Sequence, residues 1–348
     1  MFVKFQWFQR FQGFQRPGLD LFQLAVISDR RYIYMVKTLL VAAVLVAQTS
    51  TPIFRFETDG FWLNLHHFLY VLGRVEAKMP DIKREAVAGA PADEAEGLKA
   101  LTETERQAWR EAVSAYANGL SKLDMVFSRN LYDTTNVLRR APSDHPLASS
   151  TIDPAVAAAL ERAAPVYRKA WWPRHRESNR KWLQSRQDPL KKYGQQMLAY
   201  VTRVYQEPWM NGGFPVNLSG WSNWSGAYST VDSLLVIATM NPANQGLHGF
   251  EIMFHEAMHQ WDEEIDARLQ KIATANRLKF NDLLSHAMIF YTTGEAMKTV
   301  VPSHVPYAEI AGIWKGRMGA FKPALDAHWK PYLEGKTTLD EALLALQR

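Results

Sequence analysis

The run His255-Glu256-Ala257-Met258-His259 holds the side chains with the clearest chemical potential in this chain of 348 residues. At about 100° per residue, helical positions i and i+4 are about 400° apart, so the two imidazoles lie one above the other and can bind one ion. Glu256 projects about 100° away from His255, where its carboxylate reaches a water on that ion without becoming a ligand. The spacing predicts a catalytic zinc site with His255 and His259 as ligands and Glu256 as general base.

The flanking sequence predicts the elements that position this HExxH run. Apolar residues continue at helical spacing from Phe250 to Leu269, and neither Gly nor Pro interrupts residues 250–273, so we expect one continuous helix there. Residues 227–238 form a β-branched run between two turn signals, which predicts a strand. The expected order is therefore a strand, a turn and the metal helix.

A catalytic zinc ion needs three protein ligands and one open position, so a second segment must supply another ligand. We choose Glu295, which lies 36 residues past His259 in a predicted second helix at 281–301 with Asn281 as its N-cap. That separation leaves room for the end of the first helix, a turn and an antiparallel return. Asp262 lies seven residues past His255, too far along a straight helix to reach the same ion.

An HExxH run followed some tens of residues later by a Glu on another helix resembles the gluzincin metallopeptidases, the thermolysin-like and zinc-aminopeptidase group. The resemblance covers roughly residues 225–300. It implies zinc as the cofactor, a zincin-like catalytic domain and hydrolysis of peptide bonds, with Glu295 as the third metal ligand. Gluzincins commonly place an edge strand beside the metal helix, and residues 227–238 fit that place.

Two supporting roles have several candidates. In the family an acidic residue often stands four positions after the third ligand and orients a histidine, whereas this chain has Thr299 there; Asp262, Thr292 and Thr299 are the alternatives. The oxyanion that forms on the substrate carbonyl needs a hydrogen-bond donor near the metal. The candidates for that catalytic role are Tyr291, His286, Tyr307 and His304.

The amino terminus predicts export. Phe-Gln units repeat within residues 1–34, and residues 35–50 resemble a secretory signal peptide, with a Met, one Lys and an apolar stretch too short to span a bilayer. We expect residues 1–34 to be an upstream extension without a structural role, and the mature protein to be periplasmic or secreted, without stable membrane insertion. An N-terminal membrane anchor is the alternative.

Composition restricts the partners and the fold. Residues 1–50 hold six basic and two acidic residues, a net charge of +4 out of +5, so the remainder is nearly neutral and no nucleic-acid partner is expected. Cysteine is absent, so a core and a metal must stabilise the fold. We expect a predominantly helical α+β protein, with a mainly helical region at 51–205 and the zincin-like catalytic region at 206–348.

The sequence thus predicts a zinc metallopeptidase that acts on a peptide or protein substrate. Two alternatives stay open: a non-enzymatic, zinc-stabilised peptide-binding protein, and a zinc hydrolase of another amide such as a cell-wall amide. The presence of Glu256 favours an enzyme, because a purely structural zinc site has no use for a base beside the metal. The sequence indicates neither the substrate specificity nor the oligomeric state.

Overall fold

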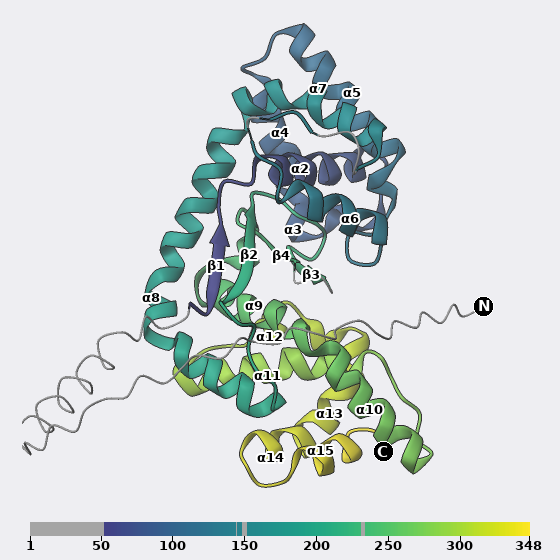
Figure 1. Ribbon diagram of the computed structural model, residues 1–348, viewed down its shortest axis with the longest axis vertical. Coiled ribbons are helices and arrows are strands. Elements are labelled where there is room, and N and C mark those ends of the chain that lie inside the picture. Colours follow the sequence, from purple (N-terminus) through teal and green to yellow (C-terminus); the bar gives the residue numbers. More distant parts are fainter. Residues whose placement is uncertain (1–51, 144, 148–151, 231–233) are drawn as a thin grey trace, which may run out of the picture. The chain divides into compact units, whose positions relative to one another are not determined.

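The computed structural model describes residues 52–143, 145–147, 152–230 and 234–348. The expected upstream extension (1–34) and signal peptide (35–50) lie outside these residues. Most described residues are helical, and four strands form a small mixed sheet (Figure 1), which confirms a predominantly helical α+β fold. Within the described ranges, no helix is both long and apolar enough to cross a membrane.

The helices differ widely in length. The longer ones are α2 (Phe61–Glu76), α5 (Glu103–Asn118), α7 (Pro154–Ala170), α8 (Trp172–Tyr205), α9 (Gly246–Met258), α10 (Asp262–Asn276) and α11 (Leu284–Val300). The shorter ones are α3 (Glu85–Ala88), α4 (Ala90–Leu98), α6 (Arg129–Leu138), α12 (Tyr307–Ile310), α13 (Lys322–Ala324), α14 (Lys330–Leu333) and α15 (Leu339–Ala345).

The sheet has the strand order β1-β2-β4-β3, formed by β1 (Phe54–Glu57), β2 (Phe214–Ser219), β4 (Leu234–Ala238) and β3 (Ala227–Thr230). β1, β2 and β4 run parallel, and β3 pairs antiparallel with β4 at one edge. The expected single strand at 227–238 is therefore two strands. A β-branched run indicates extended backbone, but it does not reveal where the chain reverses.

The sheet separates two hydrophobic cores. Side chains of the fully buried strand β4 alternate between them, with Leu235 and Ile237 in one core and Leu234 and Val236 in the other. Helices α2, α5 and α7 pack together in the second core, whereas α8, α9 and α11 pack in the first (Figure 1). The predicted metal helix, α9, thus lies in the same core as the helix predicted to supply the third ligand.

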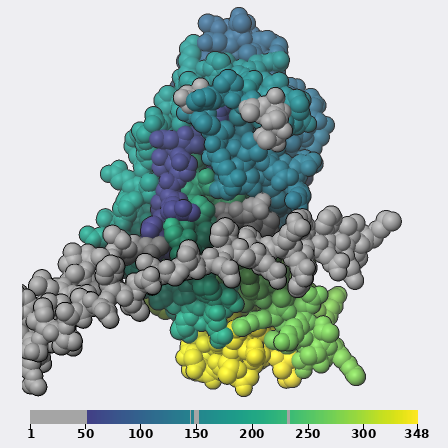
Figure 2. Space-filling model, viewed as in Figure 1, coloured from purple at the N-terminus to yellow at the C-terminus, as the bar shows by residue number. Residues whose placement is uncertain are grey.

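Strand β1 joins distant parts of the chain, because it pairs with β2 in the register Phe54↔Phe214. Residues on both sides of position 205 therefore belong to one sheet. Figure 2 shows the residues of β1, in purple, at the surface. Just after β1, Asp59 Oδ1 accepts a hydrogen bond from Nε of Arg176 in α8 at 2.7 Å.

The metal helix is divided, contrary to the expectation of a continuous helix over 250–273. Helix α9 ends at Met258, a 3₁₀ turn covers His259–Trp261, and α10 then begins. Trp261 is buried at this turn, where its indole N–H donates to the Pro208 carbonyl at 3.1 Å and its ring stacks on Tyr205. A sequence without Gly or Pro permits a helix, but such tertiary contacts can still tighten one of its turns.

Candidate metal centre

Helices α9 and α11 pack side by side in opposite directions. Three facing pairs define their register: His259 with His286, His255 with Phe290, and Glu251 with Gly294. Four residues forward on α9 match four residues backward on α11. The first two turns of α11 therefore lie opposite the two histidines of the HExxH run.

His255, His259 and His286 converge at this contact. One ring nitrogen from each lies within 4.8 Å of the others, and the Nε2 atoms of His255 and His286 are 3.3 Å apart. His255 is buried, and the other two are half-buried. The three imidazoles form a candidate metal site that needs no carboxylate ligand.

The spacing of one histidine pair, His255 and His286, fits a tetrahedral zinc ion. With Zn–N bonds of about 2.05 Å and an angle of about 109°, two ligand nitrogens are about 3.3 Å apart, the distance found between His255 and His286. Burial lowers the pKa of His286 to about 3. Burial, with the neighbouring imidazoles of His259 and His286, holds the pKa of His255 well below its usual range. Both rings are therefore neutral near pH 7, the form in which imidazole binds a metal.

Glu295, the third ligand expected from the sequence, is not brought to this cluster. It follows His286 by nine residues, which corresponds to about 13.5 Å along the helix axis and half a turn around it. Its Oε1 atom instead accepts a hydrogen bond from Lys298 Nζ at 2.7 Å. The antiparallel register places His286, rather than Glu295, opposite the histidine pair, which accounts for the difference.

Asp262 orients His259. Its Oδ2 atom accepts a hydrogen bond from His259 Nδ1 at 2.8 Å, which leaves Nε2 for the metal. The contact depends on the 3₁₀ turn, because side chains at i and i+3 eclipse in that geometry. Burial lowers the pKa of His259, but the hydrogen bond and charge of Asp262 outweigh it and the net pKa is raised.

The other two candidates for this orienting role make different contacts. Thr292 Oγ1 accepts a hydrogen bond from the Trp329 indole at 2.9 Å. Thr299 Oγ1 donates to the Ala296 carbonyl at 2.7 Å. Of the three residues considered, Asp262 is thus the one that the structure brings to a histidine.

The predicted base, Glu256, is buried on the side of α9 that faces the edge strand β3. Its Oε2 atom accepts a hydrogen bond from Ser229 Oγ of β3 at 3.0 Å. Burial raises the pKa of Glu256, although the charge of His259 and the Ser229 hydroxyl oppose the shift. Ser229 was not singled out from the sequence, because only the pairing of β3 at the sheet edge shows that it faces α9.

Tyr307, a candidate oxyanion donor, lies close enough to this base for the charge of Glu256 to affect its pKa. Its ring is nearly parallel to that of Phe290, at 6.4 Å and 7°, and Phe290 lies 3.9 Å from the His255 ring between centroids. Burial raises the pKa of Tyr307 to about 12, with the charge of Glu256 adding to the effect. Within the part of the chain that the structure describes, no hydrogen-bond partner is found for the Tyr307 hydroxyl.

The remaining donor candidates have other partners or another role. The Tyr291 hydroxyl donates to Asp326 Oδ1 at 2.7 Å, and Tyr291 is about 140° around α11 from His286. His304 Nε2 donates to Glu251 Oε2 at 2.7 Å. His286, considered for the oxyanion, belongs to the metal cluster itself.

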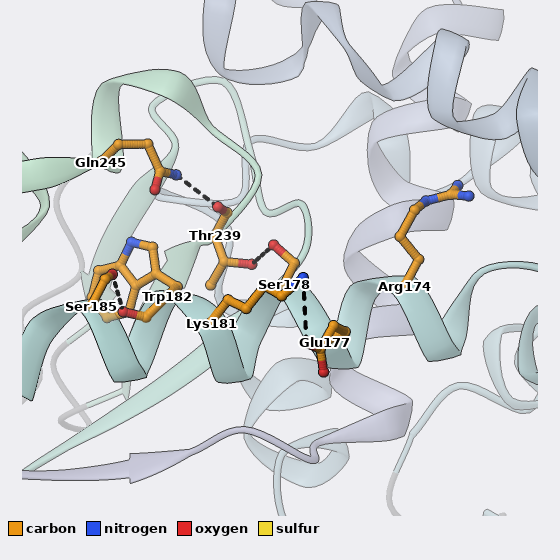
Figure 3. Close-up of a pocket in the computed structure, with 8 residues that line it drawn as sticks. All are labelled: Arg174, Glu177, Ser178, Lys181, Trp182, Ser185, Thr239 and Gln245. Atoms are coloured by element: carbon orange, nitrogen blue, oxygen red, sulfur yellow. Dashed lines mark hydrogen bonds and ion pairs between the residues drawn. The ribbon is translucent and has the colours of Figure 1, made fainter.

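A cavity of about 340 Å³ lies away from the histidines, between α8 and the residues that precede α9 (Figure 3). It is lined by Arg174, Glu177, Ser178, Lys181, Trp182, Ser185, Thr239 and Gln245. Many of their polar groups bind each other: Ser178 with Thr239, Lys181 with Glu177, and Gln245 with the Thr239 carbonyl. The candidate chemistry is thus concentrated at the histidine cluster, not in this cavity.

No family model, curated protein or solved structure matches this chain. The role of the site is therefore argued from its geometry.

Proposed function

We propose that the protein is a zinc-dependent hydrolase, a metallopeptidase, with His286 in place of Glu295 as the third zinc ligand. The observation that carries the proposal is the convergence of three histidines from α9, the turn after it and α11, with the buried carboxylate of Glu256 beside His255 on α9. Three protein ligands leave a fourth position for the reaction, as in catalytic zinc sites. Compared with the gluzincin layout expected from the sequence, this proposal keeps the metal helix and the edge strand and changes one ligand.

Several of the chain's own groups have defined roles in the proposed hydrolysis. The three histidines would hold a zinc ion, which would supply Lewis acidity and lower the pKa of a bound water towards about 7. Glu256, held by Ser229, accepts a proton from the attacking water and passes it to the leaving nitrogen. The Tyr307 hydroxyl donates a hydrogen bond to the carbonyl oxygen as negative charge develops there.

The edge strand supports a peptide or protein as the substrate. Among the described residues, β3 pairs with β4 on one side and has no second partner strand, and its Ser229 contacts the predicted base. An extended peptide can add to such an edge through main-chain hydrogen bonds, which would carry its carbonyl groups past Glu256. Export directed by residues 35–50 stays a prediction from the sequence.

Metal analysis and cleavage assays on the full chain test this proposal. We expect one zinc per chain, cleavage of an unstructured protein such as casein, loss of cleavage on chelation, and recovery when zinc is returned. Glu256→Gln should keep its zinc and lose turnover by at least about 10³-fold, since general base catalysis and the positioning of the water are lost together. Glu264→Gln, an exposed carboxylate on α10, is the matched control.

Three results would contradict the proposal. A metal-free protein that cleaves casein at the full rate would exclude the zinc mechanism, and full turnover by Glu256→Gln would exclude the base. Cleavage of peptidoglycan fragments without cleavage of casein or a peptide library would show that the substrate is another amide.

A further inference from the structure

Glu251 is a buried carboxylate one turn before His255, and the mechanism above does not use it. It is 1% exposed. Its Oε2 atom accepts two hydrogen bonds, from His304 Nε2 at 2.7 Å and from the Tyr307 backbone N–H at 2.9 Å. A buried carboxylate is costly unless it is hydrogen-bonded, so these two contacts satisfy a group that would otherwise destabilise the helix.

Further contacts hold residues 304–307, here called the anchored segment, against the α9–α11 pair. His248 Nε2 donates to the Val305 carbonyl at 2.9 Å. Pro306 packs so closely on Gly294 that a Cβ atom at the glycine would lie 2.7 Å from Pro306 Cβ. The glycine inside α11 therefore permits the close approach of the anchored segment.

The anchored segment ends at Tyr307, whose ring is linked to His255 of the histidine cluster through Phe290. Glu251 binds the backbone of Tyr307, and the Tyr307 ring lies parallel to Phe290, which in turn contacts His255. Tyr307 is thus held in two places: its backbone N–H donates a hydrogen bond to Glu251, and its ring faces that of Phe290. The hydroxyl remains available for a substrate.

We propose that Glu251 is a positioning residue that holds the Tyr307 hydroxyl at the metal centre by binding His304 and the Tyr307 backbone. Glu251 itself binds neither metal nor substrate. The catalytic part of the inference rests on the proposed hydrolase function. The structural part, that Glu251 fixes the anchored segment, can be measured without any substrate.

A double-mutant cycle tests the catalytic part, with kcat and KM measured on casein or a peptide cleaved by the wild type. Tyr307→Phe should lower kcat about a hundredfold with little change in KM, as expected for the loss of one oxyanion donor. Glu251→Ala should lower kcat about thirtyfold alone, but less than about threefold in the Tyr307→Phe background, because both changes remove the same interaction.

Two further variants serve as controls for the cycle. Glu251→Gln keeps a carbonyl oxygen that accepts both hydrogen bonds, so it should stay within about threefold of the wild type. Glu309→Gln changes an exposed carboxylate two residues after Tyr307 and is the matched control. All variants should keep the zinc content of the wild type.

Hydrogen exchange at the Tyr307 amide tests the structural part, with and without zinc. Glu251→Ala should speed this exchange at least about tenfold and leave the amides of α9 and α11 unchanged, whereas Tyr307→Phe should leave it slow. Unchanged exchange in Glu251→Ala would overturn the proposal, and so would additive losses of kcat in the cycle. If the exchange result is obtained but the wild type cleaves nothing, the anchoring stands and the hydrolase function fails.

Discussion

Replacing His286 by alanine should strongly weaken zinc binding, whereas replacing Glu295 by alanine should leave it unchanged. The two variants separate the ligand indicated by the structure from the ligand expected from the sequence. His286 Nε2 lies 3.3 Å from His255 Nε2. The Glu295 carboxylate binds Lys298, and Glu295 is half a turn around α11 from His286.

The size of the effect follows from the ligand set. Structural zinc sites bind with about 10–16 kcal/mol through four ligands, so one ligand contributes about 2.5–4 kcal/mol. At about 1.4 kcal/mol per factor of ten, His286→Ala should raise the zinc Kd by about 10²–10³-fold. Glu295→Ala should change Kd by less than about twofold. It should also cost less than about 1 kcal/mol of stability, because the Glu295–Lys298 pair is partly exposed and screened by solvent.

Competition with a fluorescent zinc chelator measures both Kd values at fixed pH. Thermal unfolding of the metal-free proteins shows whether each variant is folded, which matters because His286 also stacks on Phe290. A large loss of affinity in Glu295→Ala, together with wild-type affinity in His286→Ala, would refute the assignment. Unchanged affinity in both variants would show that zinc binds elsewhere.

Three further changes test two features of the candidate site and one buried contact of the fold. Asp262→Ala should raise the zinc Kd by about 10–100-fold in the same competition, because His259 loses the partner that orients it; an unchanged Kd would contradict this role. Ser229→Ala should lower kcat about fivefold without changing zinc content, since the general base loses one hydrogen bond of about 1 kcal/mol; a steady-state assay that gives wild-type kcat would exclude it. Asp93→Asn should lower the free energy of unfolding, measured by urea denaturation, by about 3 kcal/mol. The change weakens the buried hydrogen bond between His175 and residue 93. Burial raises the pKa of Asp93, but the donors around it, led by His175, outweigh this and hold the pKa below its ordinary value. The stabilisation is therefore present above the unfolded pKa of about 3.9 and is lost as the pH falls through the folded pKa; a variant with the same acid dependence as the wild type would argue against it.

The local part of the site could be predicted from the sequence. His255, Glu256 and His259 lie within about one turn, and helical geometry alone determines how they face one another. The apolar periodicity around them also predicted a buried helix, and the structure has α9 there. The helix boundary at the 3₁₀ turn was missed because it depends on Trp261, whose partners come from residues 205–209.

The third ligand shows the limit of this reasoning. His286 and Glu295 lie on the same predicted helix, and both are far enough from His259 in sequence for the chain to turn back. The choice between them depends on the register of α9 against α11, which the packing of both helices in one core determines. No short stretch of sequence contains that register.

The sequence by itself determined the histidine pair, the place of Glu256 beside it and the helical character of the protein, because each follows from residues a few positions apart. Only the tertiary structure decided that His286 completes the cluster, that Ser229 faces the base, and that Glu251 binds the backbone of Tyr307. Each of these contacts joins residues about 27 or more positions apart. Such contacts depend on how helices and strands pack on one another, and local conformational preference does not specify that packing.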